Sequence, residues 1–334
     1  MTVRARGKVD SRVLHSRFDF LMMSELKAFY SDHFVLPLPA GHRFPMQKYR
    51  RLREEAAAVA PDLEFHEAPT TPDGVLALAH HPDYIGRVKS GSLSGVEQKR
   101  IGFPWSPEMV ERSRRATGAT IAACRAAIEE GVAVNLAGGT HHAHAEHGEG
   151  FCVFNDSAIA ARLMQAERRV SRVAVVDLDV HQGNGTASIL RNDASVFTLS
   201  LHGESNYPFT KAISDLDVGF ADGTGDEIYL AALSKALDQL FDGFAPQLII
   251  FLAGADPHEG DRLGHLKLTF DGLARRDRMV LERAQQRGVP VAITMAGGYG
   301  TNIENTVAIH LKTLSIAAEF AAQWRTRTDR EQPA

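Results

Sequence analysis

The sequence is poor in cysteine and contains no long apolar run. Its two cysteines, Cys124 and Cys152, exclude a disulfide framework and a zinc site built from cysteine thiolates. No segment approaches the roughly 20 consecutive apolar residues that a membrane-spanning helix needs. The amino terminus also carries charges where a secretory signal would have an apolar core. These absences predict a cytoplasmic protein that has no membrane span.

An excess of positive charge is also missing. The 37 lysines and arginines are outnumbered by 41 acidic residues, and the formal net charge is −4. Nucleic-acid-binding domains concentrate basic residues, so no nucleic-acid partner is predicted. The 44% hydrophobic content is that of an ordinary globular protein. We expect a single domain over residues 25–326, a disordered extension at 1–24 and a tail at 327–334.

Strand-like and helix-like segments alternate along most of the chain. Runs of apolar residues predict buried strands, whereas apolar residues that recur every three to four positions predict helices. The expected strands are Ala28–Val35, Leu63–Glu67, Val132–Leu136, Val173–Val176, Val196–Leu201, Leu248–Leu252 and Val289–Met295. The expected helices include Tyr49–Val59, Pro107–Glu130, Leu273–Arg287 and Ile303 to about Phe320. This alternation predicts a three-layer α/β/α fold around a mainly parallel sheet.

Four of the expected strands end in a polar or glycine-rich turn. The residues at these ends are the pair His141-His142, the segment Asp179-Val180-His181, Asp256, and the turn Gly297-Gly298-Tyr299. The carboxyl ends of parallel strands lie at one edge of a sheet, where open α/β sheets bind their ligands. We therefore expect these side chains to meet in one site.

The residue types at these ends are those of a catalytic zinc centre. Catalytic zinc takes three protein ligands and keeps a position for water, and Asp179, His181 and Asp256 could supply the three. Asp177 alternates with Asp179 and His181 and would point the same way in an extended chain. Each residue taken alone has an ordinary structural explanation, so the hypothesis rests on their joint occurrence at strand ends.

Two further side-chain types would complete a hydrolytic site. One imidazole of His141-His142 could act as general base and acid while the other tunes its charge. The hydroxyl of Tyr299, on a glycine-rich turn, could donate a hydrogen bond to an oxyanion. Together with a metal-activated water these groups predict hydrolysis of a polar bond.

Five ordered motifs resemble those of the histone deacetylase family. They are Gly138-Gly-Thr-His-His-Ala143, Gly150-Phe-Cys-Val-Phe-Asn-Asp156, Asp177-Leu-Asp-Val-His-Gln-Gly-Asn-Gly185, Gly254-Ala-Asp256 with Gly260-Asp-Arg-Leu-Gly264, and Gly297-Gly-Tyr299. The resemblance runs from about Phe29 to Phe320. The Asp179–Gly185 segment, together with the loop Leu38–Pro45, is most similar to bacterial deacetylase-like proteins grouped near the class IV enzymes.

The resemblance implies a role for each matching residue. It makes Asp179, His181 and Asp256 the zinc ligands, His141 and His142 the tandem histidines, and Tyr299 the residue that polarises the substrate carbonyl. Asp177 would orient His141 and join a potassium site with Ser200 and the carbonyl of Leu201. Gly150 and Phe151 would form one wall of an acyl-lysine tunnel, and Tyr207 the opposite wall.

One position departs from the family pattern. Many members have an aspartate where this chain has Asn184, the residue expected to orient His142. A neutral amide can hold the imidazole ring but does not stabilise its charged form. We therefore expect a lower pKa for His142 than in an aspartate-paired relative.

The sequence thus predicts a zinc-dependent hydrolase that removes an acetyl or longer fatty acyl group from lysine or a related N-acyl amine. One alternative is a dinuclear manganese ureohydrolase of the arginase type. However, Gln182-Gly183 follows His181 and Pro257-His258 follows Asp256, so the Asp-x-His-x-Asp and Asp-x-Asp patterns of a two-metal site are absent. A second alternative is a protein that binds acyl-lysine without turnover. The sequence leaves open the acyl length, the physiological substrate, the choice of zinc or iron and the oligomeric state.

Overall fold

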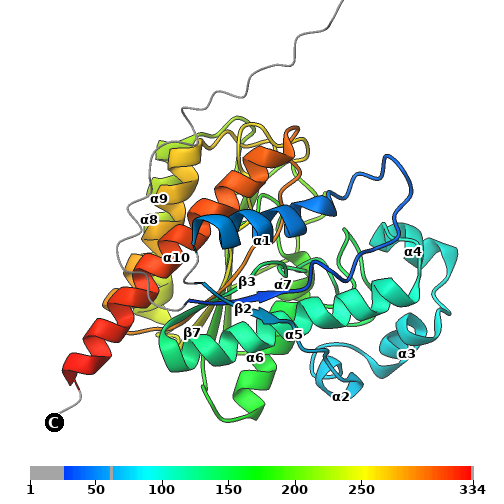
Figure 1. Cartoon of the computed structure of the whole chain (residues 1–334), viewed down its shortest axis with the longest axis horizontal. Helices are drawn as coiled ribbons and strands as arrows, with labels where there is room; N and C mark the ends of the chain where they lie inside the picture. Colours follow the sequence, from blue (N-terminus) through cyan, green and yellow to red (C-terminus); the bar gives the residue numbers. More distant parts are fainter. Residues whose placement is uncertain (1–25, 61–62, 332–334) are drawn as a thin grey trace, which may run out of the picture.

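The computed structural model describes residues 26–60 and 63–331, with side chains to Thr326. The extension expected at 1–24 lies outside the described residues. The described chain forms an eight-stranded sheet in the order β2-β1-β3-β8-β7-β4-β5-β6, and every neighbouring pair of strands is parallel. Helices cover the sheet on both sides (Figure 1). The expected three-layer α/β/α fold with a parallel sheet is confirmed.

Helical crossovers join the successive strands, except β5 and β6, which a loop connects. The strands are β1 (Lys27–Tyr30), β2 (Glu64–Glu67), β3 (Val132–Asn135), β4 (Val173–Asp177), β5 (Val196–Gly203), β6 (Leu216–Phe220), β7 (Leu248–Leu252) and β8 (Val291–Thr294). The helices are α1 (Gln47–Val59), α2 (Asp73–Leu76), α3 (Pro82–Ser90), α4 (Gly95–Ile101), α5 (Pro107–Glu130), α6 (Asp156–Ala166), α7 (Asn184–Leu190), α8 (Asp226–Gly243), α9 (Phe270–Gln286) and α10 (Ile303–Glu331).

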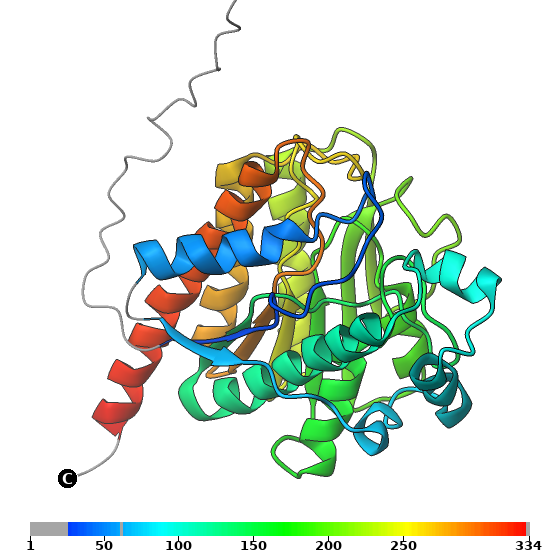
Figure 2. The same ribbon diagram turned by 45° about the vertical axis from the view of Figure 1, so that its right-hand side comes forward.

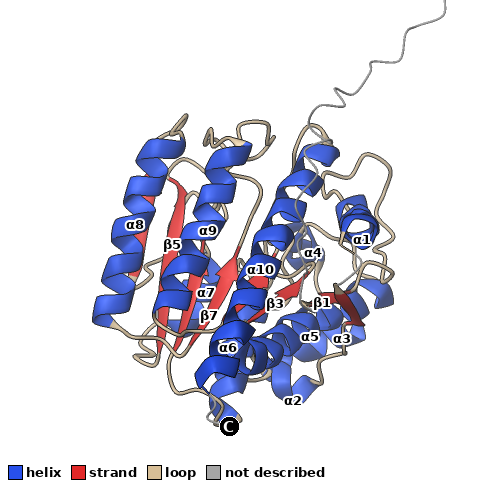
Figure 3. Ribbon diagram, turned by 60° about the vertical axis from the view of Figure 1, so that its left-hand side comes forward, coloured by secondary structure: helices blue, strands red, loops and turns tan. Residues whose placement is uncertain are grey.

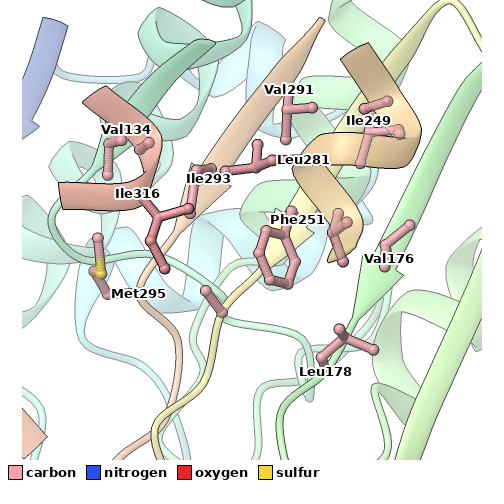
Figure 4. Packing of buried hydrophobic residues seen from close by; sticks show 14 of the residues in the cluster. Val134, Val176, Leu178, Ile249, Phe251, Leu281, Val291, Ile293, Met295 and Ile316 are labelled. Atoms are coloured by element: carbon pink, nitrogen blue, oxygen red, sulfur yellow. The ribbon is translucent and has the colours of Figure 1, made fainter. Parts of the chain in front are cut away.

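Two hydrophobic cores lie on opposite faces of the sheet, because successive strand residues point to opposite sides. In β4, Val173 and Val175 belong to one core and Ala174 and Val176 to the other. The core containing Val176 packs against α1, α8, α9 and α10 (Figures 3 and 4). The other core packs against α3, α5, α6 and α7. The central strands are therefore buried on both sides, which is why they read as continuous apolar runs.

Several boundaries differ from the expectation. Strand β1 ends at Tyr30 instead of continuing to Val35, because a turn begins at Ser31, whose carbonyl accepts from the backbone N–H of Phe34 at 3.2 Å. Helix α10 runs on to Glu331, since no proline or glycine lies between Phe320 and Glu331. Figure 2 shows α10 with α1 packed across it.

Strand β6 was not expected from the sequence. It lies at the edge of the sheet, and its short run Leu216–Phe220 includes a charged residue and a glycine. Edge strands are commonly short and carry charge, so their apolar signal is weak.

The sheet order decides where the polar turns meet. Strands β3, β8, β7 and β4 are consecutive in the sheet and point the same way. Their carboxyl ends carry His141-His142, Gly297–Tyr299, Asp256 and Asp179–His181, respectively. The four turns expected to converge are therefore neighbours at one edge.

Candidate active site

A cavity of about 470 Å³ opens over the carboxyl ends of these four strands. Residues from the turns after β3, β4 and β8 line it, together with aromatic residues from the loops above the sheet. Among the predicted site residues, the lining includes His141, His142, Gly150, Phe151, Asp179, His181, Tyr207 and Tyr299. Residues far apart in the sequence are thus brought into one chamber.

Asp179, His181 and Asp256 form a buried group whose ligand atoms all lie within 4.8 Å of one another. His181 Nδ1 lies 2.9 Å from Asp179 Oδ1 and 3.3 Å from Asp256 Oδ2. Within the described residues, Asp256 Oδ2 is buried yet accepts no hydrogen bond of acceptable geometry. A buried carboxylate oxygen of this kind is costly unless a cation or donor meets it. The donor set of two carboxylates and one imidazole fits a divalent metal.

The pKa values of His181 and Asp256 reflect the negative charge that this group concentrates. Burial opposes a charge on His181, but Asp179 and Asp256 outweigh it and raise the pKa of His181 to about 10. Burial and the neighbouring charge of Asp179 raise the pKa of Asp256 to about 7. A bound dication would take the place of these protons, because metal ligands bind in their deprotonated forms.

The backbone of the β8 turn approaches this group so closely that only glycine fits. Gly297 N–H donates to Asp179 Oδ2 at 2.8 Å. A Cβ atom at Gly297 would lie 2.0 Å from Asp256 Oδ2 and 2.4 Å from Asp179 Oδ2. The glycine is therefore a requirement of the metal-ligand cluster itself.

His141 is held by the side chain of Asp177. His141 Nδ1 lies 2.6 Å from Asp177 Oδ2, and both side chains are buried. Burial opposes the charged imidazole, yet Asp177 and Asp179 together raise the pKa of His141 to about 9. Asp177 thus turns to the histidine and stands apart from the three-residue metal group.

His142 is held by an amide in place of a carboxylate. His142 Nδ1 donates to Asn184 Oδ1 at 2.7 Å, and Asn184 Nδ2 donates to Glu149 Oε1 at 2.7 Å. Because a carboxylate only accepts, Glu149 fixes which end of the amide faces His142. His142 Nδ1 must then carry the proton, which leaves its Nε2 as the acceptor in the neutral ring.

Burial, followed by the charges of His141 and His181, lowers the pKa of His142 well below its ordinary range. The hydrogen bond to Asn184 acts in the opposite direction and raises the pKa. The expected difference from an aspartate-paired relative therefore stays a prediction. The two adjacent imidazoles, with ring centroids 4.1 Å apart, therefore have pKa values shifted in opposite directions. Such a pair can divide acid and base roles between its members.

Tyr299 stands on a turn that is anchored from three sides. Its backbone N–H donates to Asp261 Oδ2 at 2.6 Å, and its carbonyl accepts from Arg262 Nε at 2.9 Å. Buried Lys48 donates to the carbonyl of Ala296 at 2.9 Å and lies 5.6 Å from the Tyr299 ring centroid. Burial, followed by the neighbouring Tyr49, raises the pKa of Tyr299 well above its ordinary value, so the hydroxyl keeps its proton.

The predicted tunnel walls and potassium residues are also placed. Phe151 has φ +65 and packs 6.0 Å from the Tyr299 ring, while Tyr207 meets the ring of His142 at 4.9 Å. Ser200 pairs with Asp177 across strands β4 and β5, and the buried Leu201 follows Ser200 along β5.

Two supporting carboxylates were missed by sequence reasoning. Asp156 accepts from the backbone N–H groups of Gly139 and Thr140 at 2.9 and 2.8 Å, so it shapes the turn before the histidines. Glu149 orients Asn184 as described. Asp156 is the last residue of one of the five family motifs, so the sequence could have pointed to it, whereas Glu149 belongs to none of them. His144 and His147 stack on each other beside Glu149 and form a second, half-buried group with it.

A parallel α/β sheet whose strand ends unite a buried Asp–His–Asp group, paired imidazoles and a tyrosine defines a metal-dependent hydrolase. Comparison with known families gives the narrower class. The histone deacetylase domain model matches residues 42–314, and the chain belongs to the histone deacetylase family. It is accordingly a deacetylase-type amidohydrolase, with Asp179, His181 and Asp256 as its candidate metal-binding residues.

Relatives from bacteria and plants support this placement. The chain is 45% identical over 285 residues to an uncharacterized protein of Picosynechococcus sp., covering 84% of this chain and 94% of the relative. It is 31% identical to histone deacetylase 2 of Arabidopsis thaliana, covering 91% of this chain and 82% of that protein. It is 30% identical to a histone deacetylase-like amidohydrolase of Pseudomonas aeruginosa, covering 79% and 74%, respectively.

Solved structures share the fold. The HD domain of HDA15 superimposes with a TM-score of 0.76 at 22% identity, over 90% of this chain and 92% of that one. An acetylpolyamine aminohydrolase from Burkholderia pseudomallei gives a TM-score of 0.73 at 20% identity, over 87% and 98%. Membership of the deacetylase family sets aside the arginase-type alternative and the non-catalytic one. In the described part of the chain, no helix is long and apolar enough to cross a membrane.

Proposed function

We propose that this protein is a zinc-dependent deacylase that removes an acetyl or longer fatty acyl group from lysine or a related N-acyl amine. One observation carries the proposal: Asp179 and His181 of the metal group line the same cavity as both imidazoles and Tyr299. The cavity of about 470 Å³ is larger than an acetyl group needs, and the apolar residues Leu36, Phe44 and Phe103 are part of its lining. The longer acyl chains are therefore part of the proposal.

Asp179, His181 and Asp256 would hold the zinc ion. When bound, zinc supplies a Lewis acid that polarises an amide carbonyl and lowers the pKa of a bound water. Two carboxylates and one imidazole suit zinc and also accommodate ferrous iron. An activity assay must therefore be accompanied by a measurement of which metal the protein holds.

The remaining residues divide the proton transfers. His142 presents Nε2 as an acceptor for a proton of the attacking water, because its Nδ1 proton is committed to Asn184. Tyr299 donates its hydroxyl proton in a hydrogen bond to the oxyanion that develops on the former carbonyl. His141, paired with Asp177, keeps positive charge beside the reacting atoms, and a histidine then protonates the departing amine.

Three finer assignments belong to the same proposal. Phe151 and Tyr207 would flank the acyl-lysine chain, and Gly150 would leave it room, since a Cβ there would lie 2.6 Å from His142 Cδ2. Asp177, Ser200 and the Leu201 carbonyl would hold a potassium ion. The segment Asp179–Gly185 supports grouping the protein with class IV-like bacterial deacetylases.

A substrate panel tests the proposal. The purified protein is stripped of metal, reloaded separately with zinc and ferrous iron, and assayed on acetyl-lysine and longer-acyl-lysine peptides, with a hydroxamate inhibitor as control. One metal per chain and hydroxamate-sensitive release of acyl groups are expected. Two tightly bound metals per chain, or no acyl release with either metal, would overturn the assignment.

A further inference from the structure

The entrance of the cavity carries an unbalanced positive charge. Arg43 of the loop before α1, and Lys99 and Arg100 at the end of α4, are exposed side chains that line it. Apart from the metal-group residue Asp179, no acidic side chain of the described chain lines the cavity. This contrasts with a net charge of −4 for the whole sequence, so the entrance does not simply reflect overall composition.

Backbone contacts fix the end of α4, which carries Lys99 and Arg100, beside the cavity. Gly150 N–H donates to the carbonyl of Arg100 at 3.2 Å, and Phe151 N–H donates to that of Ile101 at 2.7 Å. The last turn of α4 is therefore attached to the Phe151 wall of the tunnel. In Figure 1, α4 and the loop that carries Arg43 lie at the same end of the molecule.

Neighbouring carboxylates are engaged elsewhere. Glu97, the acidic residue of α4, pairs with Arg87 at 3.1 Å. Asp222 lies 3.6 Å from His265 on another part of the rim, and Glu149 is held by Asn184. In the described part of the chain we find no carboxylate paired with Arg43, Lys99 or Arg100. These three charges are thus left to act on an incoming substrate.

We infer that the preferred substrates are N-acyl amines carrying negative charge next to the scissile amide, such as acyl-lysine flanked by aspartate or glutamate. This inference rests on the proposed deacylase function and narrows its substrate class. A pair of opposite charges about 8 Å apart in water changes affinity about twofold. Several such pairs at one entrance change it about tenfold at low ionic strength. A cationic acetylpolyamine would meet the same charges as repulsion.

Exposed Phe209 adds an apolar contact at this rim. Its side chain is 87% exposed, lines the cavity and lies 6.1 Å from the ring of Tyr207. An acidic peptide that also carries an apolar residue would therefore use both features of the entrance. A small acylated amino acid whose α-amino group is capped would present only its carboxylate.

The test compares matched acetyl-lysine peptides whose flanking residues are aspartate, asparagine or lysine, together with Nα,Nε-diacetyl-lysine, whose only charge is its carboxylate, and an acetylpolyamine. The zinc-loaded protein should show kcat/KM about tenfold higher for the aspartate peptide than for the lysine peptide at low salt. High salt should reduce that ratio toward one. A comparable gain for Nα,Nε-diacetyl-lysine would identify a small carboxylate as sufficient, and its absence would identify the acidic peptide.

Charge reversal locates the effect. In R43E/K99E/R100E, the ratio of kcat/KM for the aspartate peptide to kcat/KM for the lysine peptide should fall to one or invert. The matched control R168E/R191E/K235E makes the same change in net charge at exposed residues that do not line the cavity, and it should keep the ratio. A ratio near one in the unaltered protein, or a preference for the acetylpolyamine, would overturn the inference.

Failure of the proposed function is distinguishable from failure of this inference. The neutral asparagine peptide reports deacylation without charge, so its turnover tests the proposed function alone. Binding of two hydroxamate-capped peptides, one acidic and one basic, tests the entrance without turnover. Equal affinities for the two hydroxamates would contradict the inference even in an active enzyme.

Discussion

The side-chain amide of Asn184 lies between His142 and the carboxylate of Glu149, with hydrogen bonds of 2.7 Å on both sides. The negative charge of Glu149 therefore reaches His142 only through the amide of Asn184, whereas an aspartate at position 184 would place a charge in direct contact with the ring. Burial opposes that charge, but hydrogen bonds from His144, His147 and Asn184 hold the pKa of Glu149 well below its usual range. Glu149 is ionised and able to act on His142 through the amide.

Replacing Glu149 by glutamine tests this relay. The side-chain oxygen of the new glutamine can still accept from Asn184, but the negative charge is gone, so the protonated form of His142 loses stabilisation during turnover. We expect kcat to fall about tenfold with little change in KM, as for a charge several ångströms away in a partly buried site. The control is Glu146→Gln, which removes an exposed charge from the same loop. Equal losses in both variants would contradict the relay.

Replacing Asn184 by aspartate tests the role of the amide. Alone, Asn184→Asp places a second carboxylate in contact with that of Glu149, and we expect lower thermal stability because the two charges repel each other. Combining Asn184→Asp with Glu149→Gln removes this repulsion and pairs His142 directly with a charge. The pKa of His142 should then rise, and the acidic limb of the kcat/KM profile should move to higher pH, because the base works only when neutral. An unmoved limb in the double variant would exclude His142 as that base.

Tyr299→Phe separates transition-state stabilisation from structure. Among the described residues, the hydroxyl makes no hydrogen bond to Asp179, His181 or Asp256, whereas it would donate to the oxyanion. Loss of one such donor lowers kcat about 10²- to 10³-fold. Zinc content and affinity, measured by metal analysis and competition with a chelator, should stay unchanged. Parallel losses of turnover and zinc would show that the tyrosine is structural.

Gly297→Ala tests the close approach of the β8 turn. The added Cβ would lie 2.0 Å from Asp256 Oδ2, so the ligand cluster must open, and metal affinity should fall at least tenfold. Gly86→Ala is the matched control, because the new Cβ there meets nothing within 4 Å inside helix α3. That variant should bind metal normally and gain about 0.5–1 kcal/mol of stability. Normal metal affinity in Gly297→Ala would refute the steric argument.

His80 makes the fold sensitive to acid. Its Nδ1 donates to the carbonyl of His144 at 2.9 Å, and its Nε2 accepts from Asn155 N–H at 2.8 Å, so only the neutral ring fits. Burial lowers the pKa of His80 to about 4. The unfolded chain, with a pKa near 6.5, binds the proton first, so the free energy of unfolding decreases as pH falls from about 6.5 to 4.

The decrease in the free energy of unfolding that is attributable to His80 should reach about 2 kcal/mol at pH 5. Urea unfolding at pH 7 and pH 5, for the natural protein and His80→Gln, measures it. The glutamine variant should be less stable at pH 7 but should lose less stability on acidification. The same pH dependence in both proteins would assign the effect to other groups.

The sequence by itself determined the layers of the fold and most of the site. An apolar run such as Leu248–Leu252 predicts a strand that is buried on both faces, as in the interior of a parallel sheet. Helical periodicity in other segments predicts the helices that cover the sheet. Because parallel strands end at the same edge, the polar turns after those runs were predicted to converge. Asp179, His181, Asp256 and the paired histidines were identified in this way.

Other features depended on contacts between distant segments, which only the tertiary structure decided. Asp177 belongs with His141 and not with the metal group, although all alternate along one strand end, because the chain leaves the extended conformation after Asp177. Glu149 reaches Asn184 across 35 positions of sequence, and Arg43 joins Lys99 and Arg100 at one entrance. Local pattern carries no information on such pairings, since they arise when separate loops pack over the same strand ends.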